Sequence, residues 1–374
     1  MKTTKKLAAI LLLLCLALSM SACGGAQTPA NSTAPTPTPT FAPLPSNPAE
    51  VEETEAPASA SSLDFNLAEL DFQTPVNIMV LNGPTGFGMA KLMANTNEKY
   101  ALLDYRFTVE SDASNVSAAL INGDADIAAL PTNAASVLYN RTGGVVVAAE
   151  IVRGNLYLLQ SGGEKVSSFE DLRGKTVYAP AQNPSFIMSL LCEANGLTVG
   201  EDVEIDNTYA QPADLRTALA AGEVELAVLP EPMVTIAMSA GTGVEIALDL
   251  NEAWNRTSGD DIVLGCIVAR KEWADEHPNE LAAFLYEYNE SVEFAAQAPE
   301  AAGALIEETG VFTNGAVAAK ALPRCGLCYV TGEKMRGEIG AYLEKLYGVA
   351  PQAVGNELPG EDFYYDAKAV KAAE

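Results

Sequence analysis

Short apolar runs alternate with amphipathic stretches along residues 76–149, and the same alternation returns along residues 175–248. Aligned without gaps at an offset of 99 residues, the two stretches share twelve identities in 74 positions. The segment GDADIAALP (123–131) falls on GEVELAVLP (222–230). In each copy the pattern predicts strand–helix–strand–helix–strand–helix–strand. We therefore expect a duplicated α/β fold with two lobes, each a mainly parallel sheet flanked by helices.

The residues after the second copy predict a return to the first lobe. The run IVLGCIVA (262–269) reads as another buried strand, and three helical stretches follow at 278–298, 299–309 and 332–347. The chain would then cross between the lobes twice, near residues 160–165 and 250–261. We expect lobe 1 to hold residues 63–160 and 262–374 and lobe 2 to hold residues 161–261. A lobe interrupted by another lobe is typical of a hinged pair.

The repeat also predicts where a ligand would bind. Open parallel sheets bind ligands at the carboxyl ends of their strands, and the loops there precede helix N-termini with free N–H groups. Three pairs of equivalent loops should line a cleft between the lobes, and residues 154–155 should begin the crossing strand. The candidate ligand-binding residues are Asn82, Thr85, Gly86, Thr132, Asn133, Asn155, Gln182, Asn183, Ser185 and Glu231.

The chemistry of these loops limits the ligand. The glycine-rich segment 83–86 is not a Walker loop, because Met89 stands where lysine is required. The six loops contain no Lys or Arg, which disfavours a doubly charged anion. Glu231 has two readings: an acid that suits the first turn of a helix, or an acceptor for a cationic or donor-rich ligand.

The N-terminus reads as an export signal. Lys2, Lys5 and Lys6 precede an apolar run at residues 8–18, which is the length of a signal-peptide core and too short to span a membrane. The following Met-Ser-Ala-Cys resembles a bacterial lipobox, with Met20 in place of the usual Leu. We expect residues 1–22 to be removed, Cys23 to be lipidated, and the protein to be anchored on the extracytoplasmic face of the cell membrane. The alternative is an ordinary cleaved signal with an incidental cysteine.

Residues 23–62 should form a tether. Eight of the 21 prolines fall within residues 24–62, among Thr, Ala, Ser and Glu. Such a composition cannot bury a core and favours a semi-extended chain.

Composition excludes several classes of function. The chain carries a formal charge of −27, so binding to nucleic acid or to anionic lipid headgroups is not expected. The single histidine, His277, rules out a multi-histidine metal site. Cys325 and Cys328 form a CxxC pair with no second pair for zinc, and we expect either buried thiols or a local disulfide.

Four segments carry a resemblance to a known family: GPTGFGM (83–89), GDADIAALP (123–131), SFEDLRGKTVYAP (168–180) and GEVELAVLPEP (222–232). Together they resemble the solute-binding lipoproteins of ABC importers with the type II periplasmic-binding-protein fold. The branch they resemble binds sulfonate, nitrate or thiamine pyrimidines. The resemblance covers about residues 74–366. It implies a monomeric, non-enzymatic protein without cofactor or metal, which closes on a small solute and delivers it to a permease and ATPase complex.

Two other functions use the same fold. The eukaryotic pyrimidine synthases of thiamine biosynthesis are related enzymes, but they need a catalytic histidine and a cysteine-rich iron-binding cluster. A sensor lipoprotein would bind a solute and signal to a membrane partner. For the ligand, an amine-bearing ring of the thiamine-pyrimidine type fits the arginine-free loops better than an alkanesulfonate does.

Overall fold

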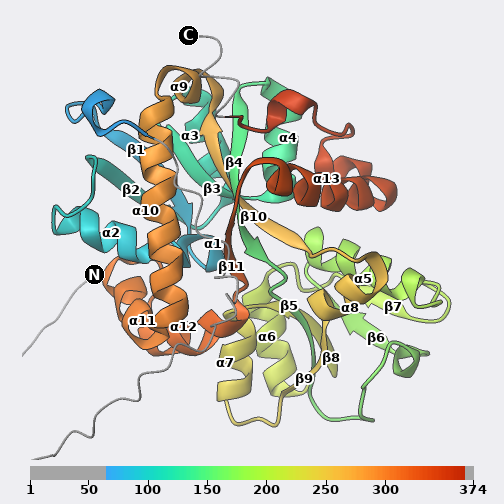
Figure 1. Ribbon diagram of the computed structural model, residues 1–374. Helices are drawn as coiled ribbons and strands as arrows, with labels where there is room; N and C mark the ends of the chain where they lie inside the picture. Colours follow the sequence, from blue (N-terminus) through green and yellow to red (C-terminus); the bar gives the residue numbers. More distant parts are fainter. Residues whose placement is uncertain (1–64, 367–374) are drawn as a thin grey trace, which may run out of the picture. The chain divides into compact units, whose positions relative to one another are not determined.

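A computed structural model describes residues 65–366 (Figure 1). The expected signal peptide, Cys23 and the tether lie outside these described residues. Within them, no helix is long and apolar enough to cross a membrane. The four cysteines of this part, Cys192, Cys266, Cys325 and Cys328, are free thiols, so the CxxC pair is not bridged.

Eleven strands of the described residues form two sheets. The first sheet holds β1 (Val76–Leu81), β2 (Tyr105–Glu110), β3 (Ile127–Pro131), β4 (Val145–Arg153), β10 (Val263–Arg270) and β11 (Leu327–Val330), in the order β11-β4-β10-β3-β1-β2. The second holds β5 (Leu156–Gln160), β6 (Thr176–Tyr178), β7 (Glu204–Asp206), β8 (Leu226–Pro230) and β9 (Glu245–Asp249), in the order β7-β6-β8-β5-β9.

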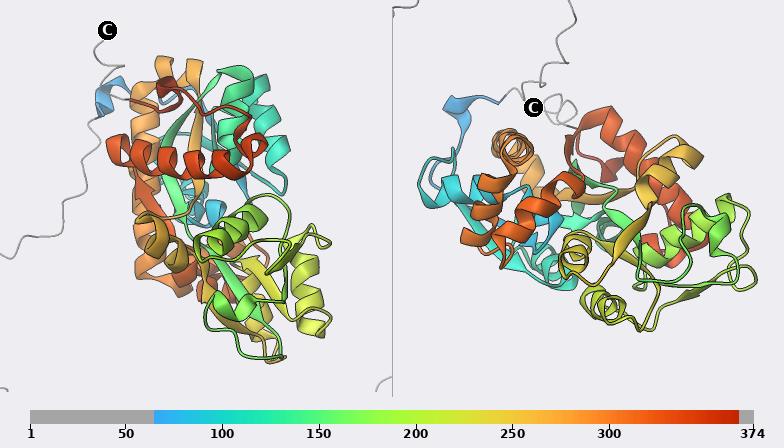
Figure 2. Two further views of the ribbon diagram at one scale, coloured as in Figure 1. Left: turned by 90° about the vertical axis from the view of Figure 1, so that its right-hand side faces the viewer. Right: turned by 90° about the horizontal axis from the view of Figure 1, so that it is seen from below.

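Helices cover both faces of each sheet (Figures 1 and 2). Those grouped with the first sheet are α1 (Pro84–Phe87), α2 (Ala90–Asn97), α3 (Ala113–Asn122), α4 (Thr132–Thr142), α9 (Lys271–Glu276), α10 (Pro278–Gln297), α11 (Pro299–Glu308), α12 (Gly315–Ala321) and α13 (Gly332–Val349). Those grouped with the second are α5 (Asn183–Ala194), α6 (Pro212–Ala221), α7 (Met233–Ser239) and α8 (Leu250–Ser258). Short 3-10 turns are η1 (Leu67–Glu69), η2 (Glu170–Leu172), η3 (Leu322–Arg324), η4 (Pro351–Val354) and η5 (Glu361–Phe363).

The repeat predicted from sequence is clearest in one helix and one strand of each copy. Helix α6 follows α3, and strand β8 follows β3, at the offset of 99 residues with the same lengths. Both helices end at a glycine in the left-handed region, Gly123 (φ 78°) and Gly222 (φ 73°). Glycine adopts this conformation without steric cost, which explains the shared position.

The parallel pairs expected from the repeat are present, and antiparallel pairs are added to them. β1 pairs in parallel with β2 and β3, and β6 with β7 and β8. The antiparallel strand β10 lies between β3 and β4, and β5 lies between β8 and β9. The edge strand β11 also pairs antiparallel with β4. The strand that follows each copy of the repeat therefore completes the sheet of the other copy.

This exchange moves one of the expected boundaries. The first lobe is expected to extend to residue 160, but β5 pairs only within the second sheet. All five residues of β5 are buried, which suits a strand with neighbours on both sides and helices on both faces. The first crossing is therefore at Gly154 and Asn155, and the second runs between α8 and β10 through residues 259–262.

The two crossings lie side by side. The Gly154 N–H donates to the carbonyl of Ile262 at 2.8 Å. The Asn251 side chain accepts from the Ile262 N–H at 3.0 Å and donates to Asp261 at 3.2 Å. Arg153, the last residue of β4, pairs with Asp261 at 3.3 Å. Both connections between the sheets are thus held together by backbone and side-chain bonds.

One apolar core is shared by the two sheets. Leu130 on β3 and Leu158 on β5 both belong to it, and their neighbours Ala129 and Leu159 belong to separate cores on the opposite faces. Tyr342 of α13 and Trp254 of α8 pack in the shared core at a ring distance of 6.1 Å. The alternation follows from the two-residue period of a strand, which presents successive side chains to opposite faces.

We predict that Gly154→Ala destabilises the protein by about 3 kcal/mol, because φ at this position is +30° and an added Cβ would overlap the Asn251 side chain. Asn251 cannot move away without losing its bonds to the second crossing. The matched control is Gly337→Ala in α13, where an added Cβ meets open space and should stabilise the helix by about 0.5–1 kcal/mol. Urea denaturation measures both, and equal effects at the two glycines would contradict this account of the crossing.

Candidate functional site

The loops predicted to bind a ligand do precede helices at the carboxyl ends of the repeated strands. Helix α1 follows β1, α4 follows β3, α5 follows β6, and α7 follows β8. The loops do not all behave alike, however. Some of their side chains meet at one pocket, and others are used within the protein.

Asn133 and Asn183 meet across the two sheets. The Asn183 Nδ2 donates to the Asn133 Oδ1 at 2.9 Å, which joins the start of α5 to the start of α4. The Asn133 Nδ2 in turn donates to the carbonyl of Ala353 in η4 at 3.4 Å. The Asn183 Oδ1 is buried and has no hydrogen-bond partner among the described residues. A hydrogen bond between two of the predicted residues thus connects elements of the two sheets.

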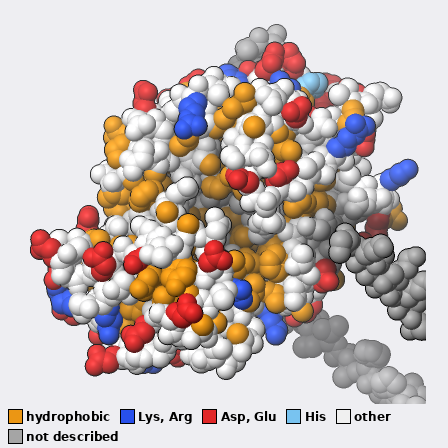
Figure 3. All heavy atoms as spheres, turned by 180° about the vertical axis from the view of Figure 1, so that it is seen from behind, with side chains coloured by type: hydrophobic (Ala, Val, Ile, Leu, Met, Phe, Trp, Pro, Cys, Tyr) orange, Lys and Arg blue, Asp and Glu red, His pale blue; other side chains and the backbone are white. Residues whose placement is uncertain are grey.

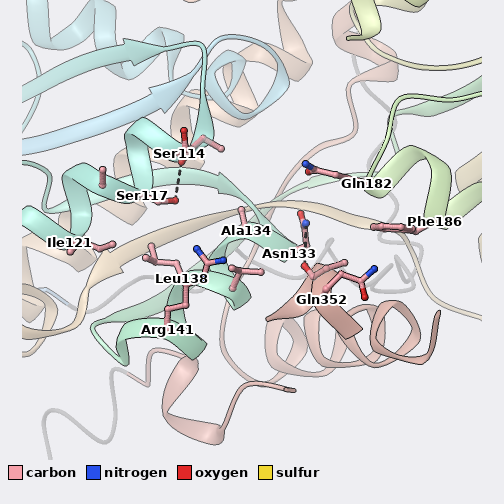
Figure 4. A pocket seen from close by; sticks show the side chains of 14 residues that line it. Ser114, Ser117, Ile121, Asn133, Ala134, Leu138, Arg141, Gln182, Phe186 and Gln352 are labelled. Atoms are coloured by element: carbon pink, nitrogen blue, oxygen red, sulfur yellow. Dashed lines mark hydrogen bonds between the residues drawn. The ribbon is translucent and has the colours of Figure 1, made fainter. Parts of the chain in front are cut away.

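A pocket of about 520 Å³ opens beside this pair (Figure 4). Helices α3 and α4 form one side, the start of α5 supplies Gln182 and Phe186, and η4 supplies Gln352. Apolar side chains such as Ile121, Leu138 and Phe186 dominate the lining. On the face opposite to that of Figure 1, hydrophobic side chains gather around a hollow (Figure 3). The pocket contains Asn133 and Gln182 from the predicted set.

Arg141 is the one charged residue in the lining of this pocket. It lies in the last turn of α4, is exposed, and forms no salt bridge within the described part of the chain. Arg141 lies outside the loops that the repeat places at the strand ends, so the loop rule does not predict it. The signal was present nevertheless: residues 133, 137 and 141 recur every four residues, and all three line the pocket from one face of a helix.

Three other predicted residues lie near the end of β1 and outside the lining of the pocket. The Thr85 methyl packs against Gly265 of β10, and an added Cβ at Gly86 would overlap the carbonyl of Leu81. Asn82 is exposed, and its backbone N–H donates to the backbone carbonyl of Glu110 at 2.9 Å. Here the glycine-rich turn serves close packing of α1 against the first sheet.

Thr132 and Ser185 are buried at the starts of α4 and α5. The Thr132 side chain lies beside the Cys266 thiol, and the Ser185 carbonyl accepts from the Ser189 hydroxyl at 3.0 Å. Neither residue belongs to the lining of the pocket.

Glu231 is engaged by the protein itself. Its side chain is fully buried, accepts from the N–H and the hydroxyl of Thr235 at 3.0 Å each, and pairs with Arg324 at 2.6 Å. Its own N–H donates to the carbonyl of Asn155 at 3.1 Å. Of the two readings left open by the sequence, the structure therefore favours the first, a carboxylate that stabilises the start of α7.

A second buried cluster surrounds Arg153 beside the crossings. The guanidinium contacts three carboxylates: Glu150 on the same strand, Asp261 at 3.3 Å, and Glu338 of α13 at 2.5 Å. The Cys328 thiol lies 3.8 Å from Glu150. Burial raises the pKa of Glu150 to about 7, although its hydrogen bond with Arg153 acts in the opposite direction. No sequence motif predicts this cluster, because its members come from β4, the second crossing, β11 and α13.

We predict that Glu150 makes stability fall as the pH rises from about 4.5 to about 7. Over that window the folded protein holds a proton on Glu150 that the unfolded chain has already lost, so folding is penalised by on the order of 3 kcal/mol above it. Glu150→Gln should remove this decline, whereas the exposed control Glu170→Gln should keep it. Denaturant unfolding at a series of pH values gives the slopes, and identical slopes for all three proteins would refute the assignment.

Comparison with solved structures identifies the class of fold. A protein described as an ABC transporter from Parabacteroides distasonis aligns with a TM-score of 0.68 and 23% identity, over 79% of this chain and 99% of that one. The aliphatic sulphonate binding protein SsuA from Escherichia coli gives 0.65 and 17%, over 78% and 92%. The nitrate-binding protein NrtA from Synechocystis PCC 6803 gives 0.56 and 14%, over 80% and 89%. The fold is that of type II periplasmic binding proteins, as the sequence resemblance implied.

The family follows from the sequence itself. The model of the NMT1/THI5-like family matches residues 100–302, which is more than half of the chain. The protein belongs to the NMT1/THI5-like family. No curated protein matches the chain.

Proposed function

We propose that this protein is the extracytoplasmic solute-binding protein of an ABC importer and that it captures a small molecule between two lobes built on the two sheets. The observation that carries the proposal is the pocket, whose walls come from α3 and α4 of the first sheet and from α5 of the second. Its volume of about 520 Å³ suits a small solute. The solved structures that share the fold include proteins named as sulphonate- and nitrate-binding.

The lobes follow the sheets. The first contains β1 to β4 together with the chain from β10 onward, and the second contains the chain from β5 to α8. When the lobes move apart, the chain bends at the two adjacent crossings, Gly154 and residues 259–262, which are joined by a backbone hydrogen bond. A solute that contacts both walls of the pocket binds the closed state more tightly, and that difference in affinity drives closure.

Pocket chemistry favours a solute with an anionic group and an apolar part. Arg141 lies at the pocket without an acidic partner among the described residues, and no Asp or Glu belongs to the lining. Glu231, the carboxylate that suggested an amine-bearing ligand, is already paired with Arg324. The alkanesulfonate class therefore moves ahead of the thiamine-pyrimidine-like ring. A singly charged head group would bind Arg141 and the amides of Gln182 and Gln352.

Pure binding is favoured over catalysis. His277 stacks on Trp273 with a ring distance of 5.3 Å, at the junction of α9 and α10, and does not line the pocket. Burial raises the pKa of all four described thiols, and that of Cys192 reaches about 12, so they stay protonated and unreactive. A sensor would use the same capture step, and uptake that depends on a permease distinguishes import from sensing.

We predict that Arg141→Met weakens binding of the anionic solute roughly tenfold to a hundredfold, because a charged hydrogen bond is lost at the pocket. The control is Arg256→Met on the exposed face of α8, which should bind like wild type. A thermal-shift screen of sulfonates, nitrate, pyrimidines and amines finds the solute, and calorimetry measures the variants. Tight binding of amines alone, unaffected by Arg141→Met, would refute the ligand class, and a new product formed from the solute would refute the pure binder.

The anchor is a separate part of the proposal. Lipidation of Cys23 would hold the protein at the outer face of the membrane, near its permease, and contact with the membrane would be limited to that lipid. We predict that Cys23→Ala abolishes labelling by a fatty-acid probe and releases the protein into the medium, because a cysteine thiol is the acceptor. Wild-type membrane retention of the variant would contradict a lipid anchor.

A further inference from the structure

The segment 322–328 (LPRCGLC), from η3 into β11, forms a third link between the sheets. At its far end β11 pairs antiparallel with β4 of the first sheet. In its middle, the Gly326 carbonyl accepts from the Arg153 N–H at 2.8 Å, beside the first crossing. Gly326 has φ +62°, and an added Cβ would overlap the carbonyl of Arg153, so only glycine permits this approach. The segment lies outside the residues matched by the family model.

Arg324 carries this link into the second sheet. Its Nε donates to the Glu231 Oε1 at 2.6 Å, and its Nη2 donates to the Thr235 hydroxyl at 2.6 Å. Its carbonyl accepts from the hydroxyl of Tyr157 on β5 at 3.3 Å. Arg324 belongs to the C-terminal segment that packs with the first sheet. It is therefore held by three groups from the second sheet and its helix α7.

Burial makes this contact sensitive to the position of the sheets. The Glu231 side chain is 0% exposed, whereas that of Arg324 is 33% exposed and is reached from outside the second sheet. If the sheets shift so that Arg324 withdraws, Glu231 becomes a buried carboxylate without a cationic partner, which is strongly unfavourable. The pair is thus satisfied only in a narrow range of relative positions of the two sheets.

We propose that Arg324 is a positioning residue that holds the second sheet in its binding-competent place and so sets the open–closed equilibrium without touching the solute. The link to an open–closed equilibrium rests on the proposed solute-binding function. The physical content of the proposal, a preferred distance between the sheets, exists without any solute.

The test measures distances in the solute-free protein. Spin labels are attached through an unnatural amino acid at two exposed positions, Tyr100 before β2 and Met238 on α7, and their separation is recorded by pulsed electron resonance. Arg324→Ala should broaden the distance distribution or add a second population. Solute affinity should fall by a factor within about 5–150. Arg324→Lys should restore part of both effects, because it keeps the charge.

The matched control is Arg270→Ala. Arg270 pairs with Asp126 at 3.2 Å with similar burial, 24% and 9%, but both residues belong to the first sheet. The Arg270→Ala variant should leave the distances between the spin labels unchanged. If Arg324→Ala fails to fold, Thr235→Val removes one bond of the link and should broaden the distribution to a smaller extent. Wild-type distances in every Arg324 and Thr235 variant, or an equal change in Arg270→Ala, overturn the proposal. If the Arg324 variants alter the distances but the wild-type protein binds no solute, the positioning role of Arg324 is supported. The proposed solute-binding function is then refuted.

Discussion

The exchange of one strand between two copies of the same α/β unit is the constraint on which the rest of the structure depends. Because β5 completes the second sheet and β10 completes the first, the chain must cross between the sheets twice at neighbouring points. The hydrogen bond from Gly154 to Ile262 joins those points, and Arg153 and Asn251 add side-chain bonds around them. These crossings would be the hinge if the proposed lobes move, and the contacts of Arg324 and the Asn183–Asn133 hydrogen bond add further links between the sheets.

The sequence predicted the duplicated elements well because the repeat is local. The helices and strands of one copy have their own apolar periods and counterparts about 99 residues away, and α3 and α6 both end at a glycine. The exchange of β5 was not predicted, because a buried strand shows the same apolar run in whichever sheet it pairs. Its residues are adjacent to β4 in sequence and belong to the other sheet in space.

The candidate site was predicted in part for a related reason. Asn133, Asn183 and Gln182 precede or begin helices at strand ends, so a rule about strand ends finds them. Arg141, Gln352 and Arg324 do not follow that rule: the first lies at the far end of a helix, and the other two lie in the C-terminal segment, which has no counterpart in the repeat. Arg141 lies within the first copy of the repeat, but its counterpart 99 residues on is Ala240, and Arg324 lies in the C-terminal segment. The repeat therefore predicts neither charge.

Small-angle X-ray scattering of the protein with and without its solute tests the central claim most directly. If a solute bridges α4 and α5, the radius of gyration should decrease as the solute is added, and the decrease should saturate in step with binding. A radius of gyration that stays constant while calorimetry shows the pocket filling would contradict closure of two lobes about the paired crossings.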